Sequence, residues 1–61
     1  MNLDGVEISG VKVINIIEEN ATAIETMVNQ AIVDIKEQGL ILVDIQTTED
    51  NIFLILGKKD T

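Results

Sequence analysis

The sequence predicts an α+β fold in which one helix packs on one face of a small, largely antiparallel sheet, in the order β-β-α-β-β. Two observations predict it. Residues 11–17, 40–45 and 52–56 form nearly continuous aliphatic runs of strand length, and residues 21–38 form one amphipathic segment of helical length. Continuous aliphatic runs are typical of strands that are buried on both faces. Because one helix covers only one of those faces, we expect the other face to be used for self-association.

Two turn signals open the chain, an Asp-Gly pair at residues 4–5 and a Ser-Gly pair at residues 9–10. Glycine at such sites supplies the positive φ that tight hairpin turns require. The signals predict a short edge strand at residues 6–8, paired with the strand at residues 11–17. An alternative is that residues 1–5 form a flexible N-terminal arm.

The helix has signals at both ends. Asn20 is a good N-cap, and Glu18 and Glu19 place negative charge where the helix dipole is positive. Gly39 suits the left-handed residue that follows many helices. Between them, apolar residues recur every three or four positions and form one stripe, made of Ile24, Met27, Val28, Ala31, Ile32 and Ile35.

The second half of the chain predicts a strand, a polar loop and a returning strand. The third strand is expected at residues 40–46, with Ile41, Val43 and Ile45 as its helix-facing core. The loop covers residues 47–51, the last strand residues 52–56, and residues 58–61 form a solvated tail. We expect residues 1–61 to form a single domain.

The self-association surface follows from the alternation of side chains along these strands. We expect a homodimer or a higher oligomer whose interface consists of Ile14, Ile16, Leu40, Leu42, Leu54 and Leu56. A change of strand register would exchange that set for Phe53 and Ile55.

Composition narrows the function. Eleven acids against four basic residues give a formal charge of −7, which disfavours nucleic acid and anionic lipid as partners. The chain has no histidine, cysteine, tyrosine or arginine, so we expect neither an enzyme nor a bound cofactor or metal ion. An enzyme built on paired carboxylates is the alternative, and it needs two acids held close together in a pocket.

An acidic chain suits a protein partner with a basic surface. The acids expected to contact such a partner are Glu18, Glu19, Glu25, Glu37, Glu49 and Asp50. The alternative is that the acids bind no partner and only keep the protein in solution. No apolar run reaches the roughly 20 residues of a membrane span, and residues 1–5 do not resemble the start of a signal peptide, so a cytoplasmic location is expected.

The chain also resembles two groups of small proteins. The strand at Val11-Lys12-Val13, the helix at residues 24–35 and the strand at residues 42–45 with its hairpin look like the small sporulation-associated proteins, a resemblance of organisation that covers about residues 11–56. In size, acidity and expected self-association the chain is similar to the phage-encoded inhibitors of bacterial immunity, including the short dimeric proteins that block the Hachiman system. That resemblance implies an anti-defence inhibitor of a host protein, and the first implies a sporulation accessory protein. Neither carries over a functional residue.

Overall fold

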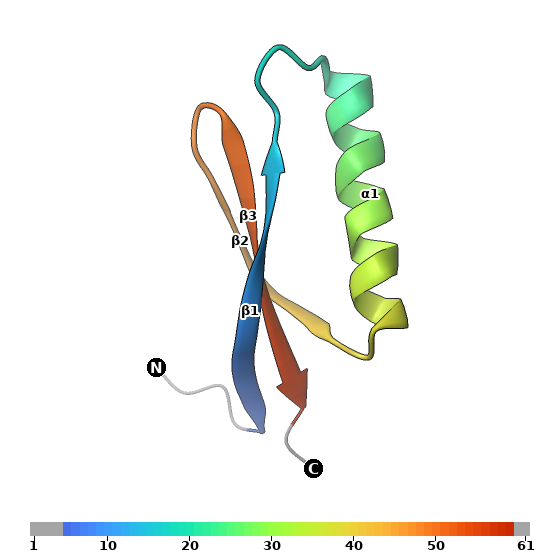
Figure 1. The fold of residues 1–61 in the computed structure, drawn as a ribbon, viewed down its shortest axis with the longest axis vertical. Helices are drawn as coiled ribbons and strands as arrows, with labels where there is room; N and C mark the ends of the chain where they lie inside the picture. The colour runs from blue at the N-terminus through green and yellow to red at the C-terminus, as the bar shows by residue number, and fades with distance from the viewer. Residues whose placement is uncertain (1–4, 60–61) are drawn as a thin grey trace.

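The computed structural model describes residues 5–59 and has the order β-α-β-β (Figure 1). The elements are β1 (Val6–Asn15), α1 (Ala21–Glu37), β2 (Ile41–Thr47) and β3 (Asn51–Lys59). Both β1 and β2 pair antiparallel with β3, so the sheet order is β1-β3-β2 and α1 connects the two outer strands. The α+β class is confirmed. Within the described residues the sheet has three strands where the sequence predicts four.

The missing strand has become part of β1. The expected turn at Ser9 and Gly10 is wrong, because both halves of this segment pair with β3 as one strand. The register runs from Ile8 opposite Gly57 to Gly10 opposite Leu56, which leaves Ser9 as an extra residue in a bulge. Glycine inside a strand often marks such an irregularity rather than a turn.

The helix begins and ends where its signals predict. The Ala23 backbone N–H donates to Asn20 Oδ1 at 2.8 Å, which confirms Asn20 as the N-cap. Gly39 follows the helix with φ of 77°, a conformation that glycine adopts without steric cost. The apolar stripe faces the sheet, and Ala31 and Ile35 are its most buried members.

Register decides which strand residues lie under α1. On β3 these residues are Ile52, Leu54 and Leu56, and on β1 the buried residue is Ile14. A second bulge in β2, between Leu42 and Asp44, leaves Val43 as the extra residue. Leu42 therefore lies opposite Leu56, and Ile45 lies opposite Leu54, on the helix side of the sheet.

Because of this bulge, part of the expected core of the third strand is wrong. Ile41 lies opposite Gly57, which belongs to the other face of β3, and Val43 packs over that same glycine. Of the three residues expected to face the helix, Ile45 alone does so. At the chain ends, Lys58 and Lys59 are exposed residues of β3 rather than of a tail, whereas residues 1–4 and 60–61 lie outside the described residues.

Candidate interaction surface

The side of the sheet that faces away from α1, here called the open face, is largely apolar. In β1 its most exposed members are Ile8, Val11 and Val13, with 56%, 53% and 54% of their surface accessible. Two strand partners, Ile55 opposite Val11 and Phe53 opposite Val13, are partly buried beside them. The apolar residues of the open face are Val6, Ile8, Val11, Val13, Ile41, Val43, Phe53 and Ile55.

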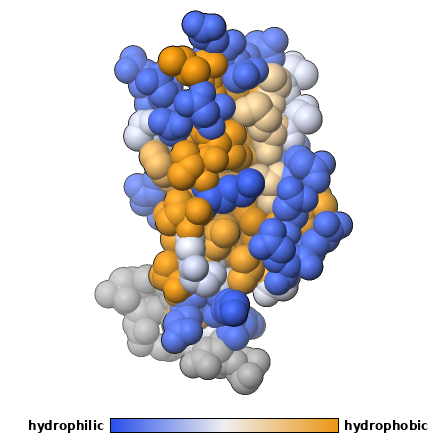
Figure 2. Space-filling model, in the orientation of Figure 1, coloured by the Kyte–Doolittle hydropathy of each residue, from blue (hydrophilic) through white to orange (hydrophobic). Residues whose placement is uncertain are grey.

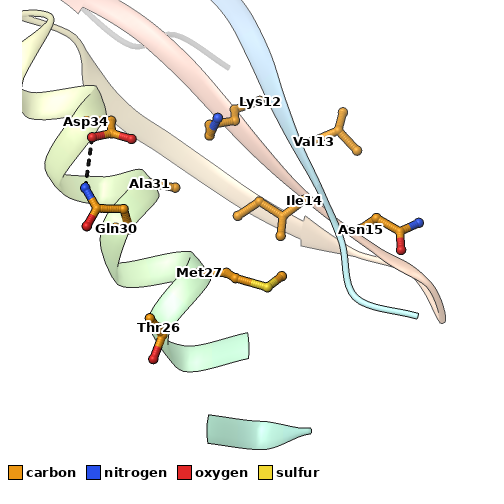
Figure 3. Close-up of a pocket in the computed structure, with 9 residues that line it drawn as sticks. All are labelled: Lys12, Val13, Ile14, Asn15, Thr26, Met27, Gln30, Ala31 and Asp34. Atoms are coloured by element: carbon orange, nitrogen blue, oxygen red, sulfur yellow. Dashed lines mark hydrogen bonds between the residues drawn. The ribbon is translucent and has the colours of Figure 1, made fainter. Parts of the chain in front are cut away.

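This face exists because β1 is apolar on both sides while α1 covers one. Ile14 has 8% of its surface accessible, in contrast to Val13 beside it. Figure 3 shows Lys12 and Ile14 pointing from β1 toward α1, while Val13 and Asn15 point away. A contiguous apolar surface of this kind on a small protein is a feature of interaction sites.

The six residues expected at a subunit interface lie on the other side of the sheet or next to it. Ile14 and Leu54 belong to the core, and Leu54 has no accessible surface. The remaining four pack against that core, namely Ile16, Leu40, Leu42 and Leu56. This set is therefore corrected, because α1 covers the face of the sheet to which Ile14, Leu42, Leu54 and Leu56 belong.

The alternative register, which presents Phe53 and Ile55, is the one that the structure has. Three residues of β1, Ile8, Val11 and Val13, were not among the expected interface residues. A signal for them was present in Asn15, which follows Val11 and Val13 at the same spacing of two. A polar residue in that series indicates the face that is less buried.

The open face becomes polar toward the loops. Asn15 Nδ2 donates to Asn51 Oδ1 at 3.3 Å across the β1–β3 pair. On β2, Asp44 accepts from the Ile45 backbone N–H at 2.8 Å and from Gln46 Nε2 at 3.0 Å. The apolar part of the open face is thus bounded at the loop end by Asn15 and Asn51 and along β2 by Asp44 and Gln46, side chains that already hydrogen-bond one another in pairs.

Five of the six acids expected to contact a partner gather at that same end. The loop between β1 and α1 and the turn between β2 and β3 lie together at the top of Figure 1. The Ile16 N–H donates to the Asp50 carbonyl oxygen at 2.8 Å and joins the two. We call this cluster the acidic end; its members are all exposed and are Glu18, Glu19, Glu25, Glu49 and Asp50. Glu37 is exposed at the opposite end of α1.

A groove of about 470 Å³ lies between β1 and α1 (Figure 3). Ile14, Met27 and Ala31 line its apolar part, and Lys12 reaches it from β1. On α1, Gln30 Nε2 donates to Asp34 Oδ1 at 3.0 Å at its edge. Figure 2 shows an apolar band running down this side of the molecule between hydrophilic residues.

The groove brings together one lysine and one carboxylate, with no second acid among its lining residues. Among residues 5–59, no group of three or more acids is placed to hold a metal ion. In the same part of the chain, α1 is not long and apolar enough to cross a membrane.

Comparison with known proteins gives no relative: no protein-family model, no curated protein and no solved structure matches this chain.

Proposed function

We propose that this protein is a non-enzymatic, acidic homodimer or higher oligomer that acts by binding another protein. Its open face packs against a second copy, and its acidic end contacts a basic surface of the target. In a bacterial host cytoplasm the form of action that fits such a module is inhibition, in which a small acidic body blocks a basic site on a host defence protein. The observation that carries the proposal is that the apolar side chains of Ile8, Val11 and Val13 are exposed on a sheet face that is itself largely apolar.

Burial of these side chains supplies the driving force for self-association. Removing a Val or Ile side chain fully from water contributes roughly 1.5–3 kcal/mol. Val11 and Val13 are about half exposed in the single chain, so each retains about half of that contribution. The open face of a second copy offers a surface of the same kind.

The acidic end supplies attraction toward a basic partner. Four carboxylates on two adjoining loops, with Glu25 on α1, create a local negative potential, which speeds encounter with a positively charged surface. Exposed charges of this kind select a partner and steer its approach more than they add to affinity. The binding is therefore expected to weaken as salt is added.

The test is the size of the particle in solution. In sedimentation velocity we expect Val13→Asp to shift the protein to smaller species than the wild type, because a carboxylate would be buried without a partner. Val33→Asp is the matched control, since Val33 is 46% accessible on α1 and lies outside the open face. Equal sizes for Val13→Asp and the wild type would contradict self-association through the open face.

A further inference from the structure

The sheet has two outer strands, and they differ in how their edges are protected. Both outer strands have a bulge and charged side chains, which are the usual means of keeping an edge strand from pairing further. In β2, the backbone N–H of Ile45 is in addition donated to Asp44 Oδ1. β1 is longer, with 10 residues against 7. By contrast, no side chain of the described residues forms a hydrogen bond with the backbone N–H or carbonyl groups of residues 6–13.

Charge adds a second observation. β1 carries two charged residues, Glu7 and Lys12, both exposed. Glu7 lies opposite Lys58 of β3, whereas Lys12 lies opposite the apolar Leu54. The Lys12 charge therefore has no counterpart across the β1–β3 pair.

We propose that β1 pairs antiparallel with β1 of a second copy of this chain, in the register that places Glu7 opposite Lys12 of the second copy. The two-fold axis then passes between Ser9 and Gly10, and the two chains form two such ion pairs. Opposite charges placed directly across a strand pair are favourable, and like charges are unfavourable. A register that placed Lys12 opposite Lys12 of the second copy would bring two like charges together.

This register also matches the two faces of the strands. It sets Ile8 opposite Val11 of the second copy and Val6 opposite Val13, and all four residues belong to the open face. Glu7 and Lys12 share the helix side, since their partners in β3 are Lys58 and Leu54. The bulge at Ser9 changes the alternation in both strands at the same place, so the faces stay matched along residues 6–13.

The result is a six-stranded sheet with both helices on one side and a doubled open face on the other. This inference rests on the self-association of the proposed function but uses a separate surface. With strands about 4.8 Å apart and a rise of about 3.3 Å per residue, one open face has a footprint of roughly 400 Å². Stable interfaces bury about 800 Å² per partner, so one open face alone is a small contact. Pairing through both surfaces gives a tetramer with three mutually perpendicular two-fold axes.

Charge reversal tests the pairing. We expect Lys12→Glu to reduce the tetramer to the dimer held by the open face, and Glu7→Lys combined with Lys12→Glu to restore the tetramer. Lys36→Glu is the matched control, because it changes the net charge equally at an exposed helix position. A Lys12→Glu variant of wild-type size, or a double variant that stays reduced in size, would overturn the inference.

A cysteine pair tests the register without altering charge. The chain contains no cysteine, so the variant with Ile8→Cys and Val11→Cys has no others. We expect mild oxidation to convert this variant into a covalent dimer, while either single variant stays uncrosslinked. Packing of open faces alone cannot mimic this, because stacked sheets lie about 10 Å apart and a disulfide needs Cα atoms within about 7 Å.

The two proposals can fail separately. A double cysteine variant that associates but does not cross-link would overturn the β1 pairing and leave open-face association standing. A variant that cross-links, together with a Val13→Asp protein of unchanged size, would support the β1 pairing and contradict the open-face contact.

Discussion

Val43 closes over Gly57 on the open face: a Cβ atom at Gly57 would lie 2.8 Å from Val43 Cγ2 and 3.0 Å from the Glu7 carbonyl oxygen. The first separation is shorter than real Cβ contacts and the second is tighter than most of them, so a Cβ at Gly57 requires a neighbouring atom to shift. The contact joins all three strands at one point, since Val43 comes from β2, Gly57 from β3 and Glu7 from β1.

Gly57→Ala is therefore expected to lower the free energy of unfolding by about 1–3 kcal/mol, the usual effect of overpacking. The measurement is denaturant unfolding at a fixed protein concentration, because association is linked to stability. The control is Val43→Ala in the Gly57→Ala background, because it removes the Cγ2 atom that the added Cβ would meet. Equal loss in both variants would show that the Val43 contact is not the cause.

Leu54→Ala separates core from interface. We expect it to lower the free energy of unfolding by about 2–5 kcal/mol at every protein concentration, because Leu54 is fully buried within one chain. Val13→Ala should instead lower the free energy of unfolding by an amount that grows with protein concentration, since Val13 is exposed until a second copy covers it. Thermal unfolding over a range of concentrations checks both. A loss of stability in Leu54→Ala that depends on protein concentration would show instead that Leu54 belongs to the subunit interface.

Asn20→Ala removes the N-cap of α1. It is expected to destabilise the protein by about 0.5–2 kcal/mol, because the Ala23 N–H loses its acceptor. The control is Asn29→Ala, an exposed position inside the helix. Circular dichroism during urea unfolding measures both, and a larger loss for Asn29→Ala would contradict the capping role.

The acidic end predicts salt-dependent binding to a basic surface. With a lysine-rich peptide as the probe, Glu49→Lys combined with Asp50→Lys should weaken binding at low salt several-fold. Glu18→Lys combined with Glu37→Lys makes the same change in net charge but removes one member of the cluster instead of two. Fluorescence anisotropy at two salt concentrations compares them. Equal weakening in both double variants would mean that net charge alone, without the cluster, governs binding.

Features set by a few neighbouring residues could be predicted from the sequence. The start of α1 at Asn20 and the left-handed residue at Gly39 depend on local chemistry, and both are confirmed. The α+β class followed from the run lengths in the same way. The grouping of acids at one end of the sheet was not predicted, because it arises from the contact between two loops that are far apart in the sequence.

The faces of the strands could not be predicted in full, because each depends on where one extra residue is inserted. The bulges at Ser9 and Val43 shift by one position which side chains of β1 and β2 lie on each face of the sheet. Neither serine nor valine is a residue type that marks a bulge in a sequence. The choice of covered face is a tertiary outcome as well. It depends on α1 packing over Ile14 and Leu54 rather than over Val13 and Phe53, although all four side chains are apolar.

Sedimentation equilibrium of the unaltered protein at low micromolar concentration shows whether a second copy of the chain covers the open face. We expect a mass that is a multiple of the 6.7 kDa chain, and a smaller multiple when Val13 is changed to Asp. A particle of 6.7 kDa at every concentration, folded and without any tendency to associate, would contradict this expectation.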